Sequence, residues 1–383
     1  MRIGINTMGF WPGKIGGAET YLRNLIDQLQ KLDTDDEYTV LCDESVMGEF
    51  NLANPRFKLK MSSYRKSSPK KVLRTLGKAL LRVDILKSEP RYLNLDLVHH
   101  PLTLMKASWA AIPSVITFYD LQHKFFPQFF SQDELARRNK IYLQSATMAS
   151  RIIAISHHTK KSLVEYCGID DEKIDVVHIG PGPGYMPNPL ESTLTAIRSK
   201  YNLDRPFMLY PAATWPHKNH PALLQALRIL KHECHFDGQL VLTGIAVTSF
   251  DALAQKAAEL GVGDNLKIIG YVPSGDLPFL YNLAELMVFP SLFEGFGIPV
   301  VEAMASGCPV VCSNTTSLPE VIGDAGVMFD PTSPGDIARA IAKVWLDPGY
   351  RNDLRQRGLE RARLFSWEET ARRTHEVYLK TAS

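Results

Sequence analysis

The sequence is poor in cysteine and contains no spacing typical of a disulfide framework or a metal site. Its cysteines are Cys42, Cys167, Cys234, Cys308 and Cys312, and no two of them form a CxxC pair. So few scattered cysteines favour a reducing, cytosolic setting over a disulfide-stabilised fold. No histidine spacing of the HExxH kind is present either, so no bound metal is predicted.

Long hydrophobic runs and an excess of one charge are also missing. No stretch approaches the roughly 18 uninterrupted apolar residues of a membrane-spanning helix. The opening MRIGIN lacks the basic and long apolar regions of a signal peptide. The net charge is only +2, which gives no reason to expect nucleic acid as a partner. We expect a cytoplasmic protein, either soluble or peripheral on the inner face of the cell membrane.

What the sequence does contain is a regular alternation of short apolar runs and longer helical patterns. Such alternation predicts an α/β fold with doubly wound parallel sheets, and 383 residues fit two domains. Helix-length segments are Ala18–Leu32, Ser156–Cys167, Pro221–His232 and Ser249–Leu260. The predicted buried strands are Arg2–Asn6, Tyr38–Cys42, Leu97–His99, Ser114–Phe118, Arg151–Ile155, Ile174–Val177, Phe207–Pro211, Gln239–Gly244, Leu266–Ile269, Leu286–Phe289 and Val310–Cys312.

A segment dense in glycine and proline marks the boundary between the two domains. It runs over Gly180–Pro189, as GPGPGYMPNP, which neither a helix nor a strand can cross. We predict a Rossmann-like domain over 1–185, a linker over 186–205 and a second Rossmann-like domain over 206–365. Residues 366–383 are expected to form a helix that crosses back to the first domain.

Two glycines follow the first predicted strand through the loop TMGFWPGKIGG. Gly16 and Gly17 open the helix that begins with AETYL, where free N–H groups and the helix dipole can hold a phosphate. A tight turn that needs a positive φ explains them equally well. The pattern is not GxGxxG, which weakens the alternative of an NAD-dependent oxidoreductase or epimerase.

The second half of the sequence places charged residues in loops that follow predicted strands. Lys218, in WPHKN, lies between a strand and a helix and could neutralise a diphosphate, although an isolated loop lysine is more often only exposed. Glu294 and Glu302 flank GFGIPVV, where Gly295 and Gly297 allow backbone N–H groups to approach a ligand. A carboxylate pair at the start of a helix suits vicinal hydroxyls, as on ribose and a sugar. Glu302 could instead stabilise its own helix.

Two features of the first half have weaker support. Asp120 and His123 follow the apolar run SVITFY, at the carboxyl end of a strand, where ligands gather in open α/β sheets. His123 could act as a base, but a single loop histidine is more often a surface residue. The basic stretch Tyr64–Leu93 has apolar positions at helical spacing, so it could bind an anionic membrane surface or simply pack as a solvated helix.

The stretch PSLFEGFGIPVVEAMASGCPVVCSNTTSLPEVIGDAG strongly resembles the signature of the retaining glycosyltransferase family 4, of the bacterial mannosyl and glucosyl transferase type. Glu294 and Glu302 match its E-x7-E motif. The segments GGAE, WPHKN and GYVPSGDL match the family in the same order along nearly the whole chain. The resemblance implies a GT-B fold, in which two Rossmann-like domains face each other across a cleft.

The resemblance also implies roles for these residues. Glu302 would bind the donor ribose, Glu294 the donor sugar and Lys218 the diphosphate. Val272 would lie near the base, and main-chain groups of Gly17 and its neighbour Gly16 would assist. Main-chain groups of Gly295, Phe296 and Gly297 would do the same. The family needs no metal or other cofactor, and its acceptor binds mainly to the N-terminal domain.

The sequence departs from the family in two places. Relatives often carry an arginine ahead of the lysine, where this chain has Ala212, Ala213 and Thr214, so neutralisation of the phosphates would rest on Lys218 or on His217. Relatives also often carry a histidine where this chain has Tyr119, and His123 could take over that role.

The triplet Asp33–Thr34–Asp35 imitates a metal-binding DxD motif. It lies between a predicted helix and a predicted strand, and we expect it to be solvent-exposed.

The function expected from the sequence is transfer of a hexose, with mannose favoured, from GDP-mannose or a UDP-hexose. The acceptor would be a glycan or a lipid-linked acceptor in surface polysaccharide or glycoconjugate synthesis, and nucleic acid is not expected to bind. Two alternatives stay open: a catalytically degenerate protein that only binds a nucleotide sugar, and an NAD-dependent sugar-modifying enzyme.

Overall fold

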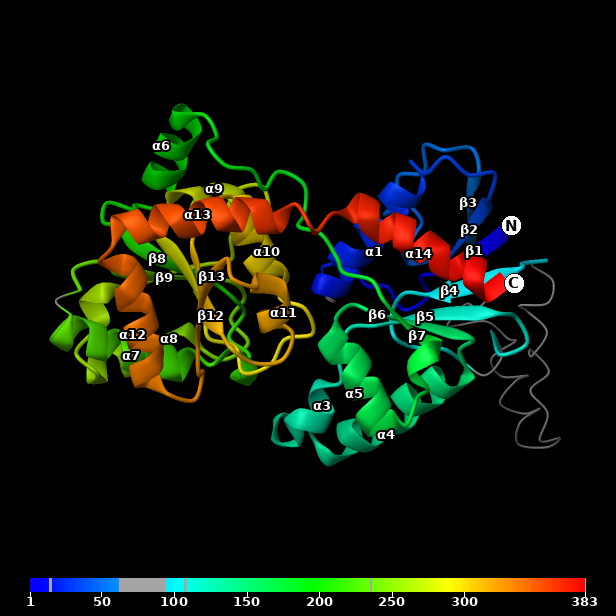
Figure 1. Ribbon diagram of the computed structural model, residues 1–383, viewed down its shortest axis with the longest axis horizontal. Coiled ribbons are helices and arrows are strands. Elements are labelled where there is room, and N and C mark those ends of the chain that lie inside the picture. Colours follow the sequence, from blue (N-terminus) through cyan, green and yellow to red (C-terminus); the bar gives the residue numbers. More distant parts are fainter. Residues whose placement is uncertain (14–15, 62–93, 107–108, 235, 383) are drawn as a thin grey trace. The chain divides into compact units, whose positions relative to one another are not determined.

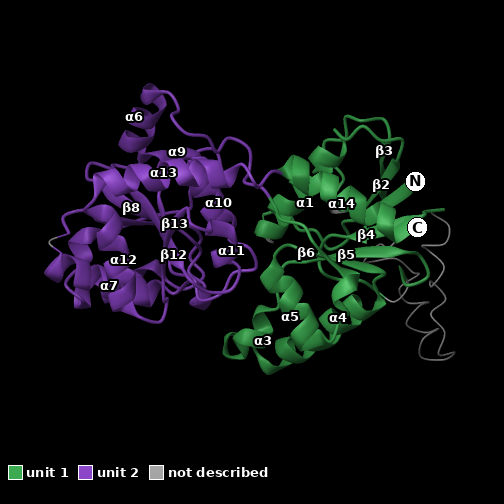
Figure 2. Ribbon diagram, viewed as in Figure 1, with its two compact units in different colours: residues 1–179, 367–383 green, residues 180–366 purple. Residues whose placement is uncertain are grey.

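The structure is a computed structural model that describes residues 1–13, 16–61, 94–106, 109–234 and 236–382. It divides the chain into two compact units, shown in Figure 2. Unit 1 contains residues 1–179 and 367–383, and unit 2 contains residues 180–366. Both are α/β units with parallel sheets, so the predicted fold class is confirmed.

Unit 1 contains a seven-stranded parallel sheet in the order β3-β2-β1-β4-β5-β6-β7. Figure 1 shows α1 and α14 on one side of this sheet and α3, α4 and α5 on the other. The strands are β1 (Arg2–Asn6), β2 (Glu37–Cys42), β3 (Phe57–Met61), β4 (Leu97–His100), β5 (Ser114–Phe118), β6 (Arg151–Ala154) and β7 (Ile174–Val176). The helices are α1 (Gly17–Leu29), α3 (Gln122–Phe125), α4 (Gln132–Met148), α5 (His157–Cys167) and α14 (Trp367–Ala382), with short 3-10 turns η1 (Glu44–Val46), η4 (Pro127–Phe129) and η5 (Asp171–Lys173).

Unit 2 contains a six-stranded parallel sheet in the order β10-β9-β8-β11-β12-β13. Helix α7 packs on α8 and α12, and α10 packs on α9, α11 and α13. The strands are β8 (Phe207–Pro211), β9 (Gln239–Thr243), β10 (Leu266–Gly270), β11 (Leu286–Phe289), β12 (Val310–Ser313) and β13 (Gly326–Phe329). The helical segments are α6 (Glu191–Lys200), η6 (Pro216–Lys218), α7 (His220–Glu233), α8 (Phe250–Glu259), η7 (Gly263–Asn265), α9 (Leu277–Leu283), α10 (Ile298–Ala305), α11 (Leu318–Ile322), α12 (Pro334–Trp345) and α13 (Pro348–Ala362).

The order of the strands reverses once in each sheet, and this reversal decides where a ligand can bind. In unit 2 the reversal lies between the neighbouring strands β8 and β11, and in unit 1 it lies between β1 and β4. At such a point the connections leave the carboxyl ends of the two strands on opposite faces of the sheet and open a crevice. The central strands are buried on both faces, as their continuous apolar runs predict.

The segment between the predicted domains belongs to unit 2. The division between the units falls between Ile179 and Gly180, and residues 186–205, expected as a linker, contain α6, which packs on α9. The last helix, α14, lies in unit 1 and packs on α1. Its Tyr378 hydroxyl lies 2.7 Å from Nδ1 of the buried His99 on β4, so the chain returns to the first unit at Trp367.

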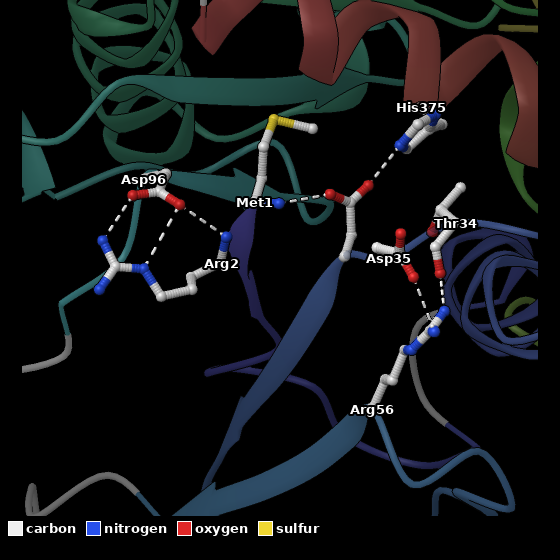
Figure 3. Close-up of polar contacts among 8 residues, drawn as sticks. Met1, Arg2, Thr34, Asp35, Arg56, Asp96 and His375 are labelled. Atoms are coloured by element: carbon white, nitrogen blue, oxygen red, sulfur yellow. Dashed lines mark hydrogen bonds and ion pairs between the residues drawn. The ribbon is translucent and has the colours of Figure 1, made fainter.

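Polar contacts at the edge of unit 1 join β1, β2 and α14, as Figure 3 shows. The buried Asp36 accepts from the Met1 amino group at 2.5 Å and lies 2.6 Å from Nε2 of His375 on α14. Asp35, whose side chain is fully exposed, pairs with Arg56 at 2.8 Å. Asp33 is exposed as well. The two outer residues of the Asp33–Thr34–Asp35 triplet therefore face solvent, as expected, and Asp35 has an arginine as its partner.

A glycine on the edge strand of unit 2 offers a test of its packing. A Cβ at Gly326 would overlap the Ile322 side chain and lie 2.6 Å from the Val310 carbonyl oxygen. We expect Gly326→Ala to lower the free energy of unfolding by about 1–3 kcal/mol, because overpacking forces the backbone and neighbouring side chains to move. Urea unfolding monitored by circular dichroism measures this change. The matched control is Gly275→Ala, where a Cβ would meet no atom within 4 Å; equal losses in both variants would contradict the packing described here.

Candidate functional site

A lysine and a glutamate meet at the strand reversal of unit 2. Lys218 follows β8 and Glu294 follows β11, and these two strands are neighbours in the sheet. The Lys218 Nζ lies 2.5 Å from the Glu294 Oε1, with side chains only 16% and 13% exposed. The same ammonium group lies 5.2 Å from the centre of the Phe289 ring. The structure therefore brings together two residues that are 76 positions apart, at the crevice where ligands bind in such sheets.

The loop that carries Lys218 is fixed by hydrogen bonds to both neighbouring segments. The Tyr210 hydroxyl donates to the Lys218 carbonyl at 2.5 Å, and the His217 carbonyl accepts from the Leu292 N–H at 2.8 Å. Asn219 adopts a left-handed conformation, with φ 61°, and its side-chain amide donates to the carbonyls of Pro290 and Pro331. These contacts fix the backbone of the lysine loop, and a loop fixed in this way favours a specific binding role.

The loop that carries Glu294 is fixed by residues that follow β12. The Glu294 N–H donates to the Thr316 hydroxyl at 3.1 Å, and the Ser317 hydroxyl donates to the Glu294 carbonyl at 3.0 Å. Gly297 has φ 98°, and a Cβ there would lie 2.6 Å from the Leu318 side chain. Only glycine fits this position, and it allows α10 to begin at Ile298, with Pro299 in its first turn.

The other residues of this loop differ in exposure. Gly295 is half-buried, whereas Phe296 is buried with its ring edge-on to Phe365 at 5.7 Å between ring centres. The first N–H groups of α10 lie beyond these two residues, close in sequence to Glu294. They offer the partial positive charge of a helix N-terminus beside the Lys218–Glu294 pair.

Glu302 lies on α10 and is buried, with 9% of its surface exposed. The Tyr281 hydroxyl on α9 donates to its Oε2 at 3.3 Å. Burial raises the pKa of the Glu302 carboxyl to about 7, although the hydroxyls of Tyr185 and Tyr281 act in the opposite direction. A carboxyl with this pKa changes its charge near neutral pH, which is typical of functional sites.

His217 and Val272 complete the predicted set in unit 2. Burial, together with the neighbouring Lys218, lowers the pKa of His217 to about 4, so its ring is neutral at pH 7. Positive charge at the strand reversal therefore comes from Lys218. Val272 is 8% exposed and follows β10, whose end is fixed by two hydrogen bonds to the Gly270 carbonyl, from Thr243 Oγ1 and from the Gly244 N–H. It lies on the same carboxyl edge of the sheet, beyond β9 and β8.

In unit 1 the loop after β1 ends at Gly16, which has φ 52° and precedes the first residue of α1, Gly17. A Cβ at Gly16 would meet no described atom within 4 Å, so the position is open. Glu19 in the first turn of α1 accepts from the Gly13 N–H at 2.6 Å and pairs with Arg23. The helix start therefore already holds one carboxylate, contributed by its own side chain.

Asp120 and His123 lie at the start of α3 in unit 1. The Asp120 Oδ1 accepts a hydrogen bond at 2.9 Å from the N–H of Gln122, the first residue of α3. His123 is 2% exposed and lies edge-on to Tyr142 of α4, with 5.1 Å between ring centres. Burial lowers the pKa of His123 to about 4. The histidine is therefore a neutral, buried ring, which differs from the exposed loop histidine that its sequence context favoured.

The Tyr119 side chain is held in place by neighbouring residues of unit 1. Its hydroxyl donates to the Pro101 carbonyl at 2.6 Å, and its ring lies edge-on to Tyr21 at 5.5 Å. Burial raises the pKa of its hydroxyl. Where the family resemblance led us to expect a histidine, this chain has a tyrosine that joins the loops after β4 and β5.

Sequence reasoning missed several residues that support the site. Thr316 and Ser317 hold Glu294, Asn219 fixes the lysine loop, and Tyr281 contacts Glu302. The threonine could have been noticed in TTSLPE, shortly after a predicted strand. The tyrosine gave no signal, because it is one apolar position among others on α9.

Two further observations concern metals and membranes. The described residues contain no group of three or more His, Cys, Asp or Glu side chains placed to hold a metal ion. Among the helices the structure describes, none combines the length and apolar character required to cross a membrane. The whole of the basic stretch Tyr64–Leu93 lies outside the described residues.

Comparisons with known proteins agree with this architecture. Residues 15–180 match the family model described as Glycosyltransferase Family 4, and residues 195–361 match that of Glycosyl transferases group 1. The O-antigen chain mannosyltransferase B of Escherichia coli is 34% identical over 267 residues, which cover 69% of this chain and 70% of that protein. The serotype-specific mannosyltransferase WbdA of the same species is 33% identical over 226 residues, but the match covers only 28% of its length.

Solved structures show the same fold. A glycosyltransferase from Rickettsia africae superposes with a TM-score of 0.74 at 19% identity, covering 99% of this chain and 98% of that one. Anabaena Alr3699/HepE, solved in complex with UDP and glucose, superposes with a TM-score of 0.74 at 18% identity, covering 99% of both chains.

The two family matches and the relative from Escherichia coli place this chain among the glycosyltransferases of family 4 and group 1. The fold is GT-B, with two Rossmann-like units. The chain is a glycosyltransferase, and the predictions of the family, the fold and glycosyltransferase activity are confirmed.

Proposed function

We propose that this enzyme transfers mannose, with retention of anomeric configuration, from GDP-mannose to a glycan or lipid-linked acceptor of a surface polysaccharide. The choice of mannose is supported by the relative from Escherichia coli, which is named a mannosyltransferase. The observation that carries the donor site is the Lys218–Glu294 pair at the strand reversal of unit 2, next to the start of α10. No cofactor or metal is part of this proposal, and the reaction is assigned to the cytoplasmic side of the membrane.

The chemistry of sugar transfer needs positive charge where the diphosphate leaves. As the glycosidic bond breaks, positive charge grows on the sugar ring and negative charge grows on the leaving phosphate. Lys218 and the N–H groups at the start of α10 supply the positive charge on the phosphate side. Glu294 binds the hydroxyls of the sugar, and its pairing with Lys218 keeps sugar and phosphate recognition within one hydrogen-bond network.

Retention is the finer part of the proposal. We assign it to attack of the acceptor on the same face of the sugar from which the diphosphate leaves, with the leaving phosphate accepting the acceptor's proton. Proton NMR of the first product formed from α-linked GDP-mannose measures the configuration. An α-mannosidic product supports retention, and a β-mannosidic product overturns it while leaving the donor site intact.

The remaining candidate residues receive roles by the same reasoning. Glu302 binds the ribose hydroxyls, Val272 contacts the base, and the main chain of Gly295, Phe296 and Gly297 faces the donor. His217 donates a hydrogen bond as a neutral ring. In unit 1, Gly16 and Gly17 present the start of α1, and Asp120 and His123 belong to the acceptor side.

A thermal-shift series tests the donor assignment. Binding to the native state raises stability by about 2.7 kcal/mol at a ligand concentration of 100 Kd, which corresponds to a rise in Tm of roughly 5–10 °C for a domain of this size. We expect this rise with GDP and GDP-mannose, and a smaller one with UDP and UDP-glucose. A rise in Tm with UDP alone would contradict the assignment of guanine as the donor base. No rise with any nucleoside diphosphate would contradict the donor site itself.

A further inference from the structure

The segment that enters unit 2 forms a strap over α9, which we define as residues Gly182–Asn188. Asn282 of α9 binds this strap twice: its Oδ1 accepts from the Asn188 N–H at 3.1 Å, and its side-chain amide donates to the Met186 carbonyl at 3.0 Å. Arg355 of α13 adds a third contact, at 3.1 Å to Asn188 Oδ1. Gly184 and Asn188 have φ 89° and 56°, so the strap turns sharply at both and is fixed in unit 2.

The strap places one aromatic side chain on the site. The Tyr185 ring lies 5.9 Å from the ring of Tyr281, at an angle of 59°. Gly182 makes room for it, because a Cβ at Gly182 would lie 3.2 Å from the Tyr185 ring. Tyr281 in turn donates to Glu302 at 3.3 Å. A residue of the strap therefore packs on the tyrosine that contacts the buried carboxyl of α10.

Tyr185 also interacts with Glu302 itself. The hydroxyls of Tyr185 and Tyr281 both stabilise the carboxylate form of Glu302, and burial, together with the proximity of Glu302, raises the pKa of the Tyr185 hydroxyl. A buried carboxylate without donors is costly, and hydrogen bonds to an ionised acceptor are among the strong ones. An ionised carboxylate has about four lone-pair positions, so two tyrosines leave room for two further donors, such as the vicinal hydroxyls of ribose.

We propose that Tyr185 is a positioning residue for the donor ribose, which orients Glu302 and so couples the strap to recognition of the nucleotide. This inference rests on the proposed role of Glu302 in binding ribose. Tyr185 acts through the carboxylate, and its removal leaves Lys218 and Glu294 unchanged.

The charged and titratable groups around α10 are few. Among the described residues, those that influence Glu302 are Tyr185 of the strap and Tyr281 of α9. On the other elements packed against α10, α13 brings Arg355 to Gly307 at the far end of the helix, and α11 carries Glu320. Cys312 is buried on β12, and Cys308 is buried just before this strand. A change in the pH dependence of Glu302 after substitution of Tyr185 can thus be assigned to the lost hydroxyl.

Titration calorimetry with GDP and 2′-deoxy-GDP, from pH 6 to pH 9, tests the proposal on Tyr185→Phe. We expect GDP to bind about tenfold more weakly at pH 7, from the loss of a hydrogen bond to a charged group, and 2′-deoxy-GDP to lose less. We also expect binding to need a higher pH, because the carboxyl of Glu302 loses one group that favours its ionised form. Tyr350→Phe on α13 is the matched control, and Asn282→Ala, which releases the strap, should act in the same direction.

The outcomes separate this inference from the proposed function. If the wild type binds GDP and Tyr185→Phe has the same affinity and the same pH profile, the inference is wrong and the donor site stands. If the wild type binds neither GDP nor UDP, the donor site fails, and a donor-free measurement decides the inference. In that measurement, the stability of Tyr185→Phe should continue to fall to a higher pH than the stability of the wild type, because Glu302 ionises at a higher pH in the variant. An unchanged profile would overturn the role of Tyr185.

Discussion

Transfer activity should fall at least about a hundredfold when Lys218 is replaced by Ala or Glu294 by Gln, because each change removes an electrostatic contact aimed at the reacting groups. Lys218→Ala removes the charge that stabilises the leaving diphosphate. Glu294→Gln retains the shape of the side chain but loses the charged partner of Lys218, 2.5 Å away. The measurement is the initial rate of mannose transfer from radiolabelled GDP-mannose to a lipid-tagged, mannose-terminated acceptor.

The chain provides a matched control for both substitutions. Lys256 and Glu259 on α8 form an exposed pair at 3.0 Å, so Lys256→Ala and Glu259→Gln make the same chemical changes away from the strand reversal. An exposed pair of this kind contributes little to stability. We expect wild-type rates in these two variants. Full activity in Lys218→Ala or in Glu294→Gln would show that the site has been assigned to the wrong residues.

The second large effect concerns the stability of the enzyme as a function of pH. Burial raises the pKa of Glu302 to about 7, from 4.5. The folded state therefore holds this proton more tightly than the unfolded state, and the stability that the proton provides is complete below pH 4.5 and is lost as the pH rises to about 7. A shift of this size corresponds to roughly 3 kcal/mol.

Glu302→Gln should remove this dependence, because an amide stays neutral. Relative to the wild type, the free energy of unfolding of Glu302→Gln should increase by about 3 kcal/mol between pH 4.5 and pH 8. Urea unfolding across this range measures it, with Glu360→Gln, an exposed position on α13, as the control. If this difference does not change with pH, the pKa of Glu302 in the folded protein is the same as in the unfolded chain, and the raised pKa is wrong. The variant should also bind GDP more weakly, since the amide accepts fewer hydrogen bonds from ribose.

The central strands were predictable because they are continuously apolar. Arg2–Asn6, Ser114–Phe118, Phe207–Pro211 and Leu286–Phe289 have the bounds expected from the sequence. The missed strands, β3 and β13, are both at the edge of a sheet. The sequence of β3, FKLKM, alternates apolar and charged residues because one side of an edge strand faces water, and β13 begins with Gly326 and buries fully only its last residue.

The site was predictable only in part, for a reason that lies in the topology. Lys218 and Glu294 could each be placed after a strand, but their contact depends on β8 and β11 being neighbours, although two strands separate them in the sequence.

The contribution of tyrosines to the surroundings of Glu302 could not be predicted from the sequence either. Tyr185 belongs to a segment that resembles a linker, and it reaches Glu302 only because Asn282 and Arg355 fix the strap. Likewise, nothing in the local sequence shows that His123 packs under Tyr142.

The donor site is tested most directly by the affinity of GDP-mannose for the wild-type enzyme and for Lys218→Ala, measured by titration calorimetry at pH 7.5. We expect the wild type to bind and the variant to bind at least about tenfold more weakly, because a charge-assisted contact with the diphosphate is lost. Equal affinities, or no binding to the wild type, would contradict a donor site at the strand reversal of unit 2.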